Sequence, residues 1–320
     1  MGEIKMKFTK MIAGAALSAC IMMAGVANAA DWKPTGPIKM QIGFGAGGST
    51  DTMSRVLAKV MKEQTGWNII AENKPGGGGI AMFTAISKMP ATGQVIGVGV
   101  NMPILVNLVK RGDKLGFDLD SFDYLGTIAK AELALVASKD APFDDLQGLV
   151  AHAKENGSMA IAFSAPPQKL LMGVVSRVSK AKLNMVTTKG GAENMKLILG
   201  GQVLAGFGSG EQLPYLESGD MKVVASANNA RLSYAKEAKT FVESGFNGYV
   251  EPYFFLATPK GTPPEALKAL TEAIDSALKS DEMVKIVGNA IKGAPLNLGS
   301  KGTKDMLVNG IDNVKILFAK

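Results

Sequence analysis

A strand, a glycine-rich loop and a helix follow one another near the start of the chain, and this order constrains the fold most. Residues 38–42 alternate apolar and polar side chains, which predicts a strand that runs into the loop GFGAGG at 43–48. Apolar residues at helical spacing come next, in a helix opened by the polar residues 49–51 and closed by Gly66. Such a unit is typical of α/β proteins.

The same order recurs along the chain, which favours right-handed crossovers and mainly parallel sheets. Strands are expected at 67–71, 95–100, 132–137, 159–163, 183–187 and 203–207, with helices from Ile80, at 144–156, near 168–178, at 192–199, from about 262 and around 306–318. Residues 249–258 predict an extended crossing back to the first unit, and TPPE at 262–265 predicts a capping box. Two α/β units joined by such crossings leave a cleft, where ligands usually bind.

Composition narrows the chemistry that the chain can perform. The 320 residues are 47% hydrophobic and 20% charged, which indicates a globular chain of about two domains. Cys20 and His152 are the only residues of their types, so His–Cys metal sites and histidine-based triads are excluded. The net charge of +7 comes without a Lys/Arg run, which argues against nucleic acid and is compatible with anionic small ligands.

The N-terminus predicts export. Three lysines precede an apolar run at 11–27, and the small residues of Ala27-Asn28-Ala29 form a cleavage motif, so residues 1–29 are interpreted as a signal peptide cut near Ala29. A membrane anchor would need a longer apolar run. A lipobox at Leu17-Ser18-Ala19-Cys20, which would make Cys20 the lipidated first residue, is the remaining alternative.

The glycine loop formally matches the dinucleotide fingerprint G-x-G-x-x-G, and Glu72 stands where a ribose-binding acid is expected. A loop between a strand and a helix start favours any anion, however, because it exposes backbone N–H groups. Export, the polar residues 49–51 and a second glycine loop at 73–79 argue against a nicotinamide oxidoreductase. A purely structural role of the glycines as tight turns stays open.

Four segments together resemble the solute-binding receptors of tripartite tricarboxylate transporters, also called the Bug family. They read PIKMQIGFGAGGSTDTMSRVLA, ENKPGGGGIAMFTAI, TTKGGAENMKLILGGQV and FFLATPKGTPPEALKAL. The resemblance implies a two-lobed α/β fold of the type II (Venus flytrap) periplasmic binding proteins, each lobe a mainly parallel sheet flanked by helices. Residues 30–130 and 251–320 would form lobe 1 and residues 131–250 lobe 2.

The function implied by this resemblance is binding, with no catalysis, cofactor or metal. A monomeric periplasmic protein would close on a small organic carboxylate and deliver it to the membrane permease subunits of the transporter. A receptor that signals to a partner protein would use the same closure and stays an alternative.

The resemblance also implies which residues hold the ligand. They are expected to be Phe44, Gly45, Ala46, Gly48, Ser49, Thr50, Asp51, Asn73 and Gly76 in lobe 1, and Ser164, Ala165, Gln168, Lys189 and Gly190 in lobe 2. Asp51 is expected to cap and orient its loop, because its charge would repel an anionic ligand.

Lobe 2 departs from the family pattern. Where the family has a turn rich in glycine and serine, this chain has Ser164-Ala165-Pro166-Pro167-Gln168, and the two prolines remove two N–H donors. The tyrosine of the family's YkG is Thr188, and the aspartate usual after GGqv is Leu204. The hypothesis is that the far end of the ligand is less anionic than that of citrate, or is held by side chains such as Ser164, Gln168 and Lys189.

Overall fold

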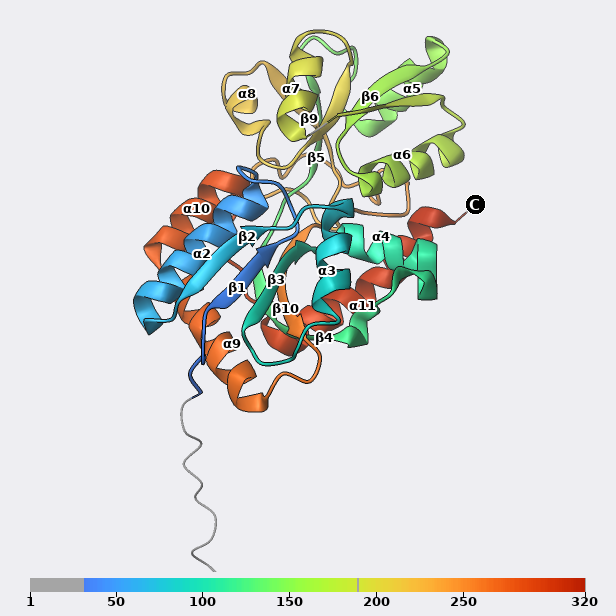
Figure 1. Ribbon diagram of the computed structural model, residues 1–320. Helices are drawn as coiled ribbons and strands as arrows, with labels where there is room; N and C mark the ends of the chain where they lie inside the picture. Colours follow the sequence, from blue (N-terminus) through green and yellow to red (C-terminus); the bar gives the residue numbers. More distant parts are fainter. Residues whose placement is uncertain (1–31, 189, 320) are drawn as a thin grey trace, which may run out of the picture. The chain divides into compact units, whose positions relative to one another are not determined.

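The computed structural model describes residues 32–188 and 190–319, and Pro34–Lys320 is a compact unit. The described strands form two five-stranded sheets (Figure 1). The first has the order β2-β1-β3-β10-β4, with β1 at Ile38–Ile42, β2 at Ile69–Asn73, β3 at Val95–Val100, β4 at Phe122–Lys130 and β10 at Tyr253–Pro259. The second has the order β7-β6-β8-β5-β9, with β5 at Ala134–Ser138, β6 at Met159–Phe163, β7 at Leu183–Thr187, β8 at Ala205–Gly208 and β9 at Met221–Ser226.

Each sheet contains one strand that opposes the others. In the first sheet β1 is parallel to β2 and β3, while β10 is antiparallel to β3 and β4. In the second, β6 is parallel to β7 and β8, while β5 is antiparallel to β8 and β9. The opposed strands β5 and β10 are those that enter each sheet after the chain crosses from the other. The fold is therefore α/β with two helix-flanked sheets, as predicted, but each sheet is mixed, with two parallel and two antiparallel pairings. Each sheet with its helices is called a lobe below.

Helices cover both faces of the first sheet (Figure 1). On one face lie α2 (Ser49–Thr65), α9 (Pro264–Leu278) and α10 (Asp281–Ile291), and on the other α3 (Ile80–Ile86), α4 (Asn101–Arg111) and α11 (Gly299–Phe318). The bounds predicted for the helix after the glycine loop are confirmed. It buries Met53 and Leu57, and it ends because Gly66 adopts a left-handed conformation with φ 73° and donates its N–H to the carbonyl of Lys62.

Alternate residues of β5 pack on opposite faces of the second sheet. Leu135 and Ala137 of β5 pack in one apolar cluster with α5 and α6, whereas Ala134 and Val136 pack in another with α7. The helices are α5 (Leu146–Glu155), α6 (Pro166–Ser179), α7 (Gly191–Leu199) and the short α8 (Leu213–Glu217). No helix within the described ranges combines the length and apolar character that a membrane crossing needs.

The structure differs from the sequence expectations at two places. The stretch after Asp120, where no strand was expected, contains the nine-residue strand β4. Its polar Thr127 is paired at long range, because its hydroxyl donates to the carbonyl of Leu296. The capping box at 262–265 is also absent from this described segment: α9 starts after Pro263, and the Thr262 hydroxyl donates to the carbonyl of Pro259.

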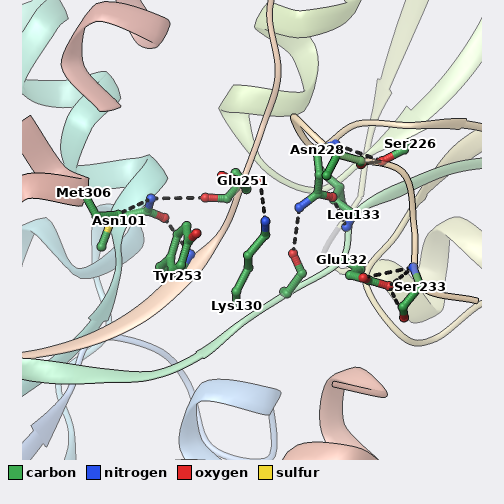
Figure 2. Close-up of polar contacts among 12 residues, drawn as sticks. Asn101, Lys130, Glu132, Leu133, Ser226, Asn228, Ser233, Glu251, Tyr253 and Met306 are labelled. Atoms are coloured by element: carbon green, nitrogen blue, oxygen red, sulfur yellow. Dashed lines mark hydrogen bonds and ion pairs between the residues drawn. The ribbon is translucent and has the colours of Figure 1, made fainter. Parts of the chain in front are cut away.

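Two crossing segments, 131–133 and 227–252, connect the lobes and run side by side (Figure 2). The N–H of Ala131 donates to the carbonyl of Pro252 at 2.8 Å. Asn228 joins the segments with both ends of its amide: it accepts from the N–H of Leu133 at 2.7 Å and donates to the carbonyl of Ala131 at 3.0 Å. Its side chain is buried, so these two hydrogen bonds take the place of bonds to water.

Polar contacts continue along the crossing toward the first sheet (Figure 2). The amide of Asn101, at the start of α4, donates to the carbonyl of Glu251 and accepts from the N–H of Tyr253. Lys130 and Glu251 form a partly buried ion pair at 2.6 Å. The ends of both crossings are thus held in one hydrogen-bonded arrangement.

An Asn228→Ala variant is expected to lower the free energy of unfolding by about 2–3 kcal/mol. The change leaves a buried N–H of Leu133 and a buried carbonyl of Ala131 without their partners. Chemical denaturation measures the loss. Asn247→Ala, an exposed position in the same crossing segment, is the control and should change stability by less than about 0.5 kcal/mol. Equal stability of the two variants would contradict the role given to Asn228.

Candidate ligand-binding site

The two glycine loops meet at one edge of the first sheet. Because β1, β2 and β3 are parallel neighbours, the loops that follow them share the carboxyl edge. A Cβ atom on Gly43 would lie 2.7 Å from the Cα atom of Gly79, so the loops touch through their backbones. Gly79 also has φ 97°, which side-chain-bearing residues rarely adopt. The loops therefore form one continuous backbone surface.

Asp51 holds the first loop in place through hydrogen bonds of its side chain. Its side chain is buried and accepts three hydrogen bonds: from the N–H of Gly47 at 2.9 Å, from Nδ2 of Asn73 at 2.7 Å and from Nε of Arg55 at 2.9 Å. Nδ2 of Asn73 also donates to the carbonyl of Phe44, and its Oδ1 accepts from Nη2 of Arg55. The Asp51 carboxylate therefore holds the first loop in position, and the amide of Asn73 helps to hold it there.

These contacts decide the charge state of Asp51. Burial alone would raise the pKa of its carboxyl. The hydrogen bonds from Gly47, Asn73 and Arg55, together with the positive charge of Arg55, lower the pKa by more than burial raises it, so it lies below the ordinary value. Asp51 is thus ionised at neutral pH. Arg55 was not among the residues expected at this site; its position four residues after Asp51, on the same side of the helix, was the signal available in the sequence.

The backbone of the first loop presents unpaired donors. The N–H groups of residues 44–46 and 48–51 meet no acceptor among the described residues, in contrast to that of Gly47. Residues 49–51 begin α2, so the positive end of the helix dipole lies there. The Ser49 hydroxyl donates to the carbonyl of Ala290 at 3.3 Å. This edge is therefore suited to an anion, held mainly by backbone N–H groups.

The turn after β6 in the second lobe is built differently. Oε1 of Gln168 accepts from the N–H groups of Ser164 at 2.8 Å and Ala165 at 3.2 Å. Pro166 and Pro167 open α6 and carry no N–H, and the N–H of Gln168 itself donates to the carbonyl of Ala165. No backbone donor of this described turn is left free.

The turn after β7 is anchored to the next strand. The Thr188 hydroxyl donates to Oδ1 of the buried Asn194 at 2.7 Å, and Nδ2 of Asn194 donates to the carbonyl of Phe207 at 2.7 Å. Gly190 stands directly before α7. Lys189 and the predicted signal peptide lie outside the described residues.

The structure gathers the predicted residues at two edges. Those of lobe 1, from Phe44 to Asp51 with Asn73 and Gly76, lie at the carboxyl edge of the first sheet, and Ser164, Ala165, Gln168 and Gly190 lie at that of the second. Their contact with a ligand stays a prediction. Within the described residues, no group of His, Cys, Asp and Glu side chains is placed to hold a metal ion.

Comparison with known proteins relates this architecture to one family. The family profile described as "Tripartite tricarboxylate transporter family receptor" matches residues 53–306. The chain is 29% identical to BugT of Bordetella pertussis over 291 residues, which cover 88% of each protein. A TctC solute-binding protein from Polaromonas has a TM-score of 0.75 and 20% identity over 90% of this chain and 99% of its own. MatC from Rhodopseudomonas palustris, solved with bound malate, has a TM-score of 0.73 and 20% identity over 89% of this chain and 100% of its own.

The fold is that of a two-lobed solute-binding protein. The chain belongs to the family of tripartite tricarboxylate transporter receptors, whose profile spans well over half of it. Members of this family are periplasmic solute-binding receptors and not enzymes. The comparisons give no support to the oxidoreductase or signalling alternatives.

Proposed function

We propose that this receptor captures a small organic carboxylate between its two lobes and delivers it to the permease subunits of a tripartite transporter. In this proposal the chain is exported, its signal peptide is removed near Ala29, and the mature protein acts as a monomer in the periplasm. Lobe 1 corresponds to residues 30–130 and 251–320, and lobe 2 to residues 131–250.

The row of unpaired N–H groups at residues 44–46 and 48–51 carries the proposal. Asp51 holds this row in place while directing its own charge toward Gly47, Asn73 and Arg55. A carboxylate fits such a surface because its two oxygens accept several hydrogen bonds at once. The malate bound to MatC supports the same ligand class.

Magnitudes indicate how many contacts the ligand needs. A hydrogen bond to a charged group contributes about 1.5–3 kcal/mol, and a helix N-terminus contributes about 0.3–1 kcal/mol at an exposed site. A micromolar dissociation constant corresponds to about 8 kcal/mol. Because binding must also offset the lost freedom of the ligand, the loop at residues 44–51 is expected to supply only part of the affinity, with the second lobe supplying the remainder.

Mass spectrometry of the natively purified protein tests the function. Full-length chain expressed with its signal peptide should be recovered from the periplasm, cut near Ala29, and should release a small organic acid on denaturation. The acid should then bind the emptied protein in calorimetry with a dissociation constant of about a micromolar or less. A retained nucleotide, or purified protein that releases no acid and binds none, would contradict the proposal.

A further inference from the structure

In two turns at the carboxyl edge of the second sheet, backbone N–H groups donate to side-chain oxygens of the protein itself. In the turn at 164–168 the oxygen belongs to a glutamine, as described above. In the turn after β8, the N–H of Ser209 donates to Oε2 of Glu211 at 2.9 Å, and that of Gly210 donates to Oε1 of Gln212 at 2.8 Å. Since β8 is the parallel neighbour of β6, both turns lie at the same edge. These four donors are therefore closed to a ligand.

The two glutamines that close the turns are fixed in place. Gln212 is buried, and its Nε2 donates to the hydroxyl of Tyr234 at 2.7 Å. Gln168 is only 7% exposed. A ligand oxygen that displaced Oε1 of Gln168 would leave a nearly buried amide oxygen without a donor, which is costly. The N–H groups of these turns therefore stay bonded to the protein's own side-chain oxygens and do not bind a ligand carboxylate.

Negative charge lies at the start of the helix that follows β7. Figure 1 shows α7 and α8 close together, and the carboxylate of Glu211, just before α8, lies against Gly191, the first residue of α7. A Cβ atom on Gly191 would collide with the carboxylate carbon and both of its oxygens. The positive end of α7 therefore already has the carboxylate of Glu211 beside it, and a further anion there would meet like charge.

We propose that the second lobe selects against a second carboxylate. The ligand is then a molecule with one carboxylate and a neutral or cationic far end, such as an amide, a hydroxyl or an ammonium group. Gln168 and Glu211 set this preference, the first by occupying donors and the second by its charge. The inference rests on the proposed function, in which the first lobe holds the carboxylate.

Calorimetry with matched probes tests the preference. Adipate, its monoamide and 6-aminohexanoate share six carbons, while succinate, succinamate and 4-aminobutanoate share four, and within each series only the far end differs. In the series that fits, the amide or the amine is expected to bind wild-type protein at least about 30-fold tighter than the diacid. A diacid that binds as tightly as its amide and amine, or more tightly, would overturn the inference.

Two variants connect the preference to the named residues. Glu211→Gln removes the charge and Gln168→Ala opens two donors, so each should strengthen diacid binding about tenfold while the amide changes less than about threefold. Glu217→Gln, an exposed position at the far end of α8, makes the same charge change and should leave the ratio unaltered. Because Glu211 is exposed, its variant is expected to fold even where Gln168→Ala does not. An unchanged ratio in Glu211→Gln would overturn the role of the charge.

Two other outcomes separate this inference from the proposed function. Tight diacid binding that Lys189→Ala abolishes would show that a lysine accepts the second carboxylate, and would overturn the inference while the carboxylate receptor stands. Binding of none of the six probes, together with no acid released from natively purified protein, would overturn the proposed function itself.

Discussion

An Asp51→Ala variant is expected to lose about 3 kcal/mol of unfolding free energy and to bind carboxylates at least 100-fold more weakly. The buried carboxylate accepts hydrogen bonds from Gly47, Asn73 and Arg55, and its removal takes away the acceptor that joins these three groups. The loop then loses the contacts that aim its free N–H groups. Denaturation and calorimetry measure the two effects. A variant with wild-type affinity would show that the loop holds its shape without Asp51.

The contribution of Asp51 is expected to depend on pH. Despite burial, the hydrogen bonds from Gly47, Asn73 and Arg55 hold the pKa of the folded carboxyl below the ordinary value of 3.8. The stabilisation is therefore fully present above about pH 5 and is lost as the pH falls through the unfolded and then the folded pKa. The difference in stability between wild type and Asp51→Asn should be constant from about pH 5 to 7 and shrink at lower pH. A difference that grows on acidification would contradict this assignment.

A single methyl group on Gly43 is expected to disturb both glycine loops. In Gly43→Ala the new Cβ would lie 2.7 Å from the backbone of Gly79, which cannot rotate away as a side chain can. We expect a loss of about 2–3 kcal/mol in stability and of at least tenfold in carboxylate affinity. Gly45→Ala is the matched control for stability, because its Cβ would meet nothing within 4 Å. If the two variants are equally stable, close contact between the loops is not what requires glycine at position 43.

Sequence patterns predicted the first strand, the helix after it and the strands β6 and β7 well. In these segments the side-chain period, the glycines and the helix ends all indicate one structure, so local signals suffice. β4 was missed because both α9 and α11 cover it, so that it lacks the alternation of a half-exposed strand. The carboxylate of its Asp123 accepts from the N–H groups of Gly261 and Thr262, a contact that no local pattern indicates.

The candidate site could be predicted only in its backbone part. Strand ends and glycines fix where the loops lie, and the sequence shows both. Nothing local indicates that Oε1 of Gln168 fills the turn at 164–168, or that Glu211 lies against Gly191, because these contacts depend on how turns of separate strands meet at one edge. The prolines of the turn after β6 gave a partial signal, since two missing donors already pointed to a weak anion site.

The central claim is that backbone N–H groups of the first loop hold the ligand's carboxylate, and a proline at position 49 tests it most directly. Ser49 is the first residue of α2 and follows an extended Gly48, so proline fits there and removes one N–H without disturbing the helix. Ser49→Ala, which loses only the hydroxyl, is the control. Calorimetry with the acid recovered from native protein should show Ser49→Pro binding about 10- to 100-fold more weakly than Ser49→Ala, at similar thermal stability. Equal affinity of the two variants would contradict the account.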